Sequence, residues 1–141
     1  MKVLLDTNIV LDVLLERSPF VKYAREIFLL AESQKIDAFL CATTVTTLHY
    51  LVGRQLNKQT ADHAIKQLLI LFDVASVNRK ILQDASSEPS VDYEDRVLYL
   101  SAAYANIDYI VTRDKKGFDS SIVPSISPEE FLAFYKTGEN K

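Results

Sequence analysis

The sequence has a single cysteine, Cys41, among its 141 residues. One thiol excludes an internal disulfide and a zinc cluster built on thiolates, and it is typical of a cytoplasmic protein. No apolar run reaches the roughly 18 residues that cross a membrane, so we expect no membrane partner. The net charge of −3 gives no overall attraction to nucleic acid. A nucleic-acid ligand would therefore need metal ions or a local basic patch to offset its phosphates.

The chain also lacks the pattern of a signal peptide, because only one Lys and a short apolar run precede Asp6. Its length is that of one domain with a substantial core. Hydrophobic residues make up 48% and charged residues 25%, which is ordinary for a globular protein. We expect a single domain over residues 1–136 and a frayed tail over 137–141.

Apolar patterns predict strands that alternate with helices along the chain. Strands are expected at residues 2–5, 36–41, 72–77, 108–112 and 122–126. Helices are expected at residues 9–15, 19–33, 43–56, 60–71, 78–86, 91–105 and 127–136, the last opened by a capping box. This alternation predicts an α/β fold, a three-layer α/β/α sandwich with a mainly parallel central sheet.

The first strand runs directly into a carboxylate, Asp6. A charge at the end of a buried strand is costly unless something pairs with it. Asp6 is therefore either a helix cap or the first wall of a ligand site at the carboxyl ends of the strands. Thr7 and Asn8 offer alternative caps, which favours the site over the cap for Asp6.

Further carboxylates stand where a site would need them. Asp95 falls on the apolar stripe of the helix expected at 91–105, and Asp114 follows the strand expected at 108–112. Taken singly, Asp95 is explained by the helix dipole and Asp114 by a turn. A parallel sheet would instead bring Asp6, Asp95 and Asp114 to one edge. Such a cluster needs a hard cation, Mg²⁺ or Mn²⁺, which activates water for hydrolysis of a phosphodiester.

An ordered set of motifs carries a resemblance to a known family. In order they are Asp6-Thr7-Asn8, Asp92-Tyr93-Glu94-Asp95, Ile110-Val111-Thr112-Arg113-Asp114 and Ser127-Pro128-Glu129-Glu130-Phe131-Leu132. The set resembles the PIN-domain family of metal-dependent ribonucleases, in particular the bacterial branch that includes toxins of toxin–antitoxin pairs. No single motif is specific, but the similarity runs from Val3 to about Phe134.

The resemblance implies a role for each matching residue. Asp6, Asp95 and Asp114 would be the catalytic, metal-binding carboxylates, Asn8 would support Asp6, and Asp92 matches an acid common in this branch. It also implies RNA as substrate, a homodimer and an antitoxin partner.

One position departs from the family pattern, because Thr47 stands where the third helix usually carries an acid. A hydroxyl is a far weaker metal ligand than a carboxylate. We expect Asp92, rather than Glu94, to compensate, since Glu94 falls on the side of the helix away from Asp92. His49 is expected in the core or at an interface.

Basic and aromatic residues near these motifs suggest contacts with partners. Lys115 and Lys116 directly follow Asp114 and are expected to contact RNA phosphates, whereas Arg113 is expected to pair with Asp95 or Asp114. A second face of the helix expected at 91–105 is also apolar, which indicates either a helix buried on both faces or a partner interface; it carries Tyr93, Val97, Leu100 and Tyr104. Because the resemblance implies dimers, we favour the interface.

Three functions remain open from the sequence. The favoured one is a divalent-metal-dependent ribonuclease, with the toxin of a toxin–antitoxin pair as one form of it. The alternative is a catalytically degenerate module that binds RNA or a partner, which Thr47 keeps open. A phosphotransfer protein that uses Asp6 as phosphoacceptor is disfavoured, because Asn8 stands where such phosphatases have a second Asp.

Overall fold

The structure is a computed structural model, which describes residues 1–87, 92–114 and 122–139. Its strands are β1 (Lys2–Leu5), β2 (Asp37–Cys41), β3 (Asp73–Ala75), β4 (Tyr109–Val111) and β5 (Ser125–Ile126). Its helices are α1 (Thr7–Leu14), α2 (Val21–Glu32), α3 (Ala42–Gln55), α4 (Lys58–Leu71), α5 (Arg79–Ser86), α6 (Tyr93–Tyr104) and α7 (Pro128–Glu139). Within this described part, no helix is long and apolar enough to cross a membrane.

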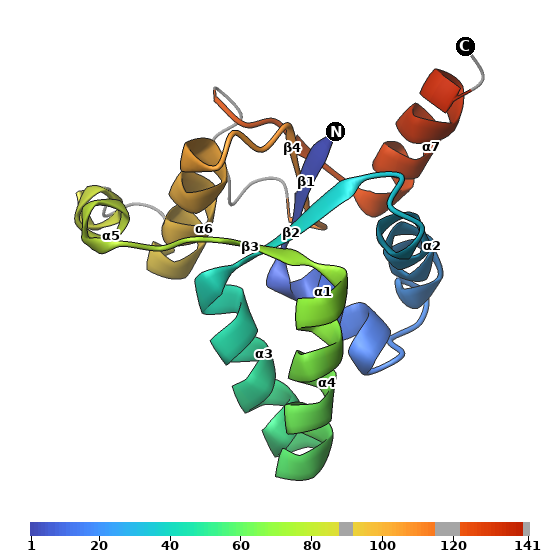
Figure 1. Ribbon diagram of the computed structural model, residues 1–141, viewed down its shortest axis with the longest axis horizontal. Coiled ribbons are helices and arrows are strands. Elements are labelled where there is room, and N and C mark those ends of the chain that lie inside the picture. The colour runs from blue at the N-terminus through green and yellow to red at the C-terminus, as the bar shows by residue number, and fades with distance from the viewer. Residues whose placement is uncertain (88–91, 115–121, 140–141) are drawn as a thin grey trace.

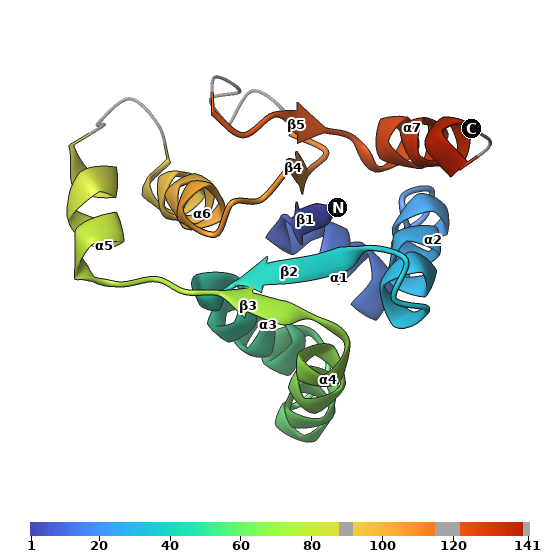
Figure 2. The same ribbon diagram turned by 45° about the horizontal axis from the view of Figure 1, so that its top comes forward.

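The strands form one sheet in the order β3-β2-β1-β4-β5, and the four pairings are parallel. Because side chains alternate along a strand, Val3 and Leu5 enter one core with α1, α2, α3, α4 and α7. Leu4 enters a second core with Leu98 and Ala102 of α6 on the other face. Figures 1 and 2 show this arrangement, with α3 and α4 projecting side by side from the sheet. The predicted three-layer α/β/α fold is confirmed.

Local sequence signals set several helix ends. The capping box at the start of α7 is present: the Ser127 hydroxyl accepts from the Glu130 N–H (3.1 Å), and the Ser127 N–H donates to Glu130 Oε1 (3.2 Å). Helix α7 continues to Glu139, beyond the end expected at residue 136. Helix α1 begins earlier than expected, at Thr7, because Asp6 caps it instead of Thr7 or Asn8.

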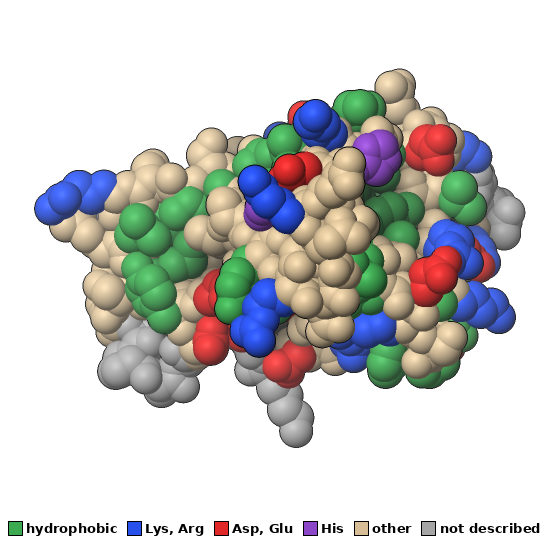
Figure 3. Space-filling model, turned by 90° about the horizontal axis from the view of Figure 1, so that it is seen from below, with side chains coloured by type: hydrophobic (Ala, Val, Ile, Leu, Met, Phe, Trp, Pro, Cys, Tyr) green, Lys and Arg blue, Asp and Glu red, His purple; other side chains and the backbone are tan. Residues whose placement is uncertain are grey.

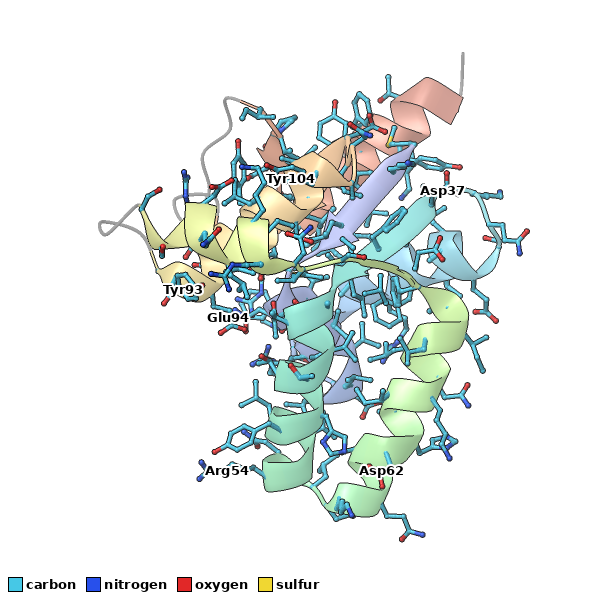
Figure 4. The ribbon with its side chains drawn as sticks, turned by 60° about the vertical axis from the view of Figure 1, so that its left-hand side comes forward. Asp37, Arg54, Asp62, Tyr93, Glu94 and Tyr104 are labelled. Carbon is cyan, nitrogen blue, oxygen red and sulfur yellow. The ribbon has the colours of Figure 1, made fainter. Side chains whose placement is uncertain are left out.

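The second apolar face of α6 is largely covered within the chain. Val97 is buried with Ile81 and Ala85 of α5, and Leu100 packs against them. Tyr93 and Tyr104, at the two ends of α6, remain about half exposed (Figure 4). The prediction that this whole face is a dimer interface is therefore wrong, since apolar spacing does not distinguish a helix of the same chain from a partner.

Candidate functional site

The carboxyl ends of β1 and β4 lie side by side, since Leu5 is registered with Val111. Asp6 follows β1, and its N–H donates to the Val111 carbonyl (3.0 Å). Its Oδ2 accepts from the Thr112 hydroxyl (2.9 Å) and its Oδ1 from the Thr7 N–H (2.8 Å). Asp6 is only 8% exposed. The cap and the site wall were alternatives in the sequence, but Asp6 is both.

A pocket of about 210 Å³ opens at this edge of the sheet. Carboxylates from three separate segments line it: Asp6, Glu94, Asp95 and Asp114. The remaining polar lining is Thr7, Asn8 and Thr47, and the apolar wall is Leu11, Leu51 and Leu98. The structure thus brings together the three acids selected from the sequence, with Asn8 and Thr47 beside them.

The convergence of negative charge changes how two of these acids titrate. Burial raises the pKa of Asp6 above 3.8; hydrogen bonds oppose this rise, and the charges of Asp114 and Glu94 add to it. Burial also raises the pKa of Asp95 from 3.8 to about 6, helped first by the charge of Asp6 and then by those of Asp92, Asp114 and Glu94. Like charges held this closely favour either a proton or a cation at the site.

The residue beside Thr47 is Glu94, whose Oε1 accepts a hydrogen bond from the Thr47 hydroxyl (3.0 Å). Figure 4 shows Glu94 extending from the first turn of α6 toward α3. Asp92 is exposed, does not line the pocket, and caps α6 by accepting from the Asp95 N–H (3.2 Å). The acid beside Thr47 is thus Glu94 and not Asp92, because the capping bond holds Asp92 at the end of the helix.

Hydroxyl groups connect the segments that carry the acids. The Thr112 hydroxyl donates to Asp6 and also accepts from the Asp114 N–H (3.0 Å). The Thr7 and Thr44 hydroxyls are 3.0 Å apart, which joins the start of α1 to α3. The predicted RNA contacts, Lys115 and Lys116, lie outside the described residues.

Sequence reasoning missed a buried charge beside the site, Asp12, which is 0% exposed. It pairs with Arg17 (2.9 Å) and with Arg113 (2.9 Å). The expectation that Arg113 pairs with Asp95 or Asp114 is wrong, since both carboxylate oxygens of Asp12 accept from its guanidinium. The available signal was a lone acid inside the apolar run 9–14.

His49 pairs within the chain. Its Nε2 lies 2.7 Å from Oδ1 of Asp62 on α4, and its side chain is 42% exposed. The expectation of a core histidine is therefore wrong, because His49 links α3 to α4 near the surface, and its place at an interface stays a prediction. Figure 3 shows basic and acidic side chains interspersed over the face that these helices form.

Comparison with known proteins gives concordant matches. The family model described as "PIN domain" matches residues 2–116. Ribonuclease VapC1 from Aquifex aeolicus (strain VF5) is 26% identical over 141 residues, which cover 96% of each chain.

Solved structures share the fold at low identity. A toxin–antitoxin complex from Klebsiella pneumoniae contains a chain with a TM-score of 0.66 and 18% identity, over 89% of this chain and 97% of that one. The sarcin–ricin loop cleaving toxin VapC20 from Mycobacterium tuberculosis has a TM-score of 0.63 and 13% identity, over 85% and 92%. Since the family model matches most of the sequence, the chain belongs to the PIN domain family.

Proposed function

We propose that this protein is an endoribonuclease that hydrolyses RNA phosphodiester bonds with a divalent cation, Mg²⁺ or Mn²⁺. The observation that carries the proposal is the convergence of Asp6, Glu94, Asp95 and Asp114 on one small pocket. These acids come from the segment after β1, from α6 and from the segment after β4, so no single local motif explains why they meet. Ribonuclease VapC1 is similar over almost the whole chain, which supports RNA as the substrate class.

The donor set suits a hard divalent ion. PIN ribonucleases generally use divalent metals, and carboxylate oxygens are the ligands that Mg²⁺ and Mn²⁺ prefer. Within the part of the chain that is described, no three acids, histidines or cysteines converge closely enough to hold an ion alone. Mg²⁺ usually takes one or two carboxylates and keeps several waters. One or two of Asp6, Asp95 and Asp114 would bind the ion directly, and the other acids, with Glu94 at the side of the pocket, would accept hydrogen bonds from its waters.

The remaining groups prepare the pocket for such chemistry. When bound, a divalent ion supplies an activated water and neutralises charge on the phosphate. Thr112 and the Thr7 N–H fix the two oxygens of Asp6. Leu11, Leu51 and Leu98 form the apolar wall beside the acids. The site therefore needs no covalent nucleophile from the protein.

Glu94 is the residue that we propose restores the charge missing at Thr47. The Thr47 hydroxyl orients the Glu94 carboxylate at 3.0 Å, so this carboxylate occupies the side of the pocket that faces α3. The second candidate function, a degenerate module that binds RNA or a partner without cleavage, is favoured only by the loss of an acid at Thr47.

We further propose that the chain is the toxin of a toxin–antitoxin pair and binds an antitoxin protein in the cytoplasm. The toxin–antitoxin complex from Klebsiella pneumoniae, whose fold matches over 89% of this chain, supports this assignment. The homodimer expected from the family resemblance stays a prediction, with Tyr93 and Tyr104 as the exposed part of the α6 face.

The test is cleavage of a mixed RNA pool by wild type, Asp6→Asn and Asp37→Asn, each with Mg²⁺, with Mn²⁺ and with chelator. Asp37 is an exposed acid at the amino end of β2 (Figure 4), so its change removes the same charge far from the pocket. We expect metal-dependent cleavage by wild type and Asp37→Asn, and a loss of orders of magnitude in Asp6→Asn. RNA binding without cleavage in either metal would favour the degenerate module, and no RNA binding would refute the nuclease.

A further inference from the structure

An ion cluster built on one buried carboxylate joins α1 to the segment after β4. Its centre is Asp12, whose Oδ1 accepts from Arg17 Nε (2.9 Å) and Arg113 Nη2 (3.1 Å), and whose Oδ2 accepts from Arg113 Nε (2.9 Å). A carboxylate that is 0% exposed needs such partners to stay charged. The two arginines make unequal links, as their places in the chain show.

Arg17 comes soon after Asp12, and its N–H also donates to the Asp12 carbonyl (3.0 Å). Its side chain bonds to Asp12 and, through Nη2, to the Asn8 carbonyl (3.2 Å), so its links stay within α1 and the turn that ends it. Arg113 lies 101 residues away, directly before Asp114. Its bond ties the segment after β4 to α1.

The Arg113 guanidinium is paired with Asp12 and is also held in one orientation. It makes a two-pronged contact with Asp12, and its Cζ lies 3.8 Å from the centroid of the Phe20 ring. The planar guanidinium fork can satisfy both contacts at once, which a lysine ammonium cannot. The backbone at Arg113 is thereby held on the side of the sheet that faces α1.

The neighbours of Arg113 transmit this constraint to the pocket. Thr112, on one side, donates to Asp6, and Asp114, on the other, donates its N–H to the Thr112 hydroxyl. Three consecutive residues, 112–114, are thus anchored, and the middle one, Arg113, is held by Asp12. The Asp114 carboxylate at the end of this series lines the pocket with Asp6 and Asp95.

We propose that Asp12 and Arg113 are positioning residues that fix Asp114 opposite Asp6 and Asp95. This inference rests on the proposed function insofar as the pocket holds a divalent ion. Arg17 supplies charge to Asp12 without setting the place of Asp114. Arg17 and Arg113 therefore form a matched pair for an experiment, because each contributes one cation to the same buried carboxylate.

The experiment compares Arg113→Met with Arg17→Met. Both should lower the melting temperature, since each removes one partner of Asp12. Arg113→Met should weaken Mn²⁺ binding by about 10–100-fold in calorimetric titration, as is typical when a group that orients metal ligands is lost. Arg17→Met should leave Mn²⁺ affinity close to that of wild type. Arg113→Lys should recover the affinity only in part, because it restores the charge without the fork.

A second measurement does not depend on metal. Exchange of the Asp114 amide proton, followed by NMR without metal, should accelerate in Arg113→Met and stay unchanged in Arg17→Met. If Arg113→Met fails to fold, Phe20→Leu removes the ring against the guanidinium without leaving Asp12 unpaired, and smaller changes in the same direction are expected.

The outcomes separate this inference from the proposed function. Equal Mn²⁺ affinity and equal Asp114 exchange in the two Met variants would show that the cluster only stabilises the fold, and would overturn the inference. If wild type binds no Mn²⁺, the proposed function fails, and the exchange rates alone decide whether Arg113 holds Asp114 in place.

Discussion

Replacing Asp95 with Asn should stabilise the metal-free protein by an amount that grows with pH. Asp95 is held beside Asp6, Asp92, Asp114 and Glu94, and burial together with these charges raises its pKa from 3.8 to about 6. Asparagine keeps the shape of the side chain and removes the charge. The increase in the free energy of unfolding measures how much the charged carboxylate destabilises the metal-free fold.

The sign and size follow from the two pKa values. The folded protein binds the Asp95 proton near pH 6, whereas the unfolded chain binds it near pH 3.8. Stability therefore falls as pH rises from about 4 to 6, and the penalty is complete above pH 6. A difference of about two pH units corresponds to about 3 kcal/mol. Because solvent screens this partly exposed carboxylate, we expect about 1–2 kcal/mol.

The assay is thermal unfolding of wild type and Asp95→Asn in chelator, from pH 4 to pH 8. For a chain of this length, 1–2 kcal/mol corresponds to a rise of about 3–6 °C in melting temperature. The rise should be absent near pH 4, grow between pH 4 and 6, and reach its full size above pH 6. Asp92→Asn is the control, because it removes a charge from the same helix while Asn still caps it, and its gain should be smaller.

Saturating Mn²⁺ should reverse the order of stability, because the ion stabilises wild type by binding the folded state and Asp95→Asn binds it far more weakly. A difference between the two proteins that does not change with pH would refute the electrostatic reasoning. Equal gains in Asp95→Asn and Asp92→Asn would attribute the effect to net charge instead of to the pocket.

Two further predictions concern the rim of the site. Glu94→Gln should weaken Mn²⁺ binding about tenfold in calorimetric titration. Thr47→Glu should not tighten Mn²⁺ binding, because the new carboxylate would face Glu94. Tighter binding in Thr47→Glu would show instead that the site lacks a carboxylate on α3. Changing Lys115 and Lys116 together to Ala should weaken RNA binding and reduce its salt dependence without altering Mn²⁺ affinity, as filter binding over a salt series would measure.

The parts of the fold that depend on local sequence could be predicted closely. The strand at 2–5 and the Asn78 cap of α5 follow from an apolar run and from a side chain that accepts from the Ile81 N–H (3.0 Å). The meeting of Asp6, Asp95 and Asp114 also followed, because a parallel sheet brings its strand ends to one edge. These inferences needed only periodicity, caps and the direction of the strands.

Contacts between distant segments could not be predicted in the same way. Arg113 had nearby acids in the sequence, yet it binds Asp12, 101 residues away. Asp12 stood alone among apolar residues, and nothing near it in the sequence indicated its partner. The spacing of Val97 marked an apolar face, but only the structure shows that α5 covers it. The sequence pattern indicates which residues must be buried or paired, but it does not indicate which distant residue each of them contacts.

The fold places the acids of this pocket, because these residues or their neighbours also cap helices or follow strands. Asp6 caps α1, Thr112 follows β4, and Asp92 caps α6 just before Glu94. The scaffold thus assembles negative charge before any ion is bound, and burial together with this charge raises the pKa of Asp95. A hydroxyl at Thr47 adds no charge and donates to Glu94. Thr47 therefore orients a carboxylate on that side of the pocket without adding to the negative charge of the metal-free protein.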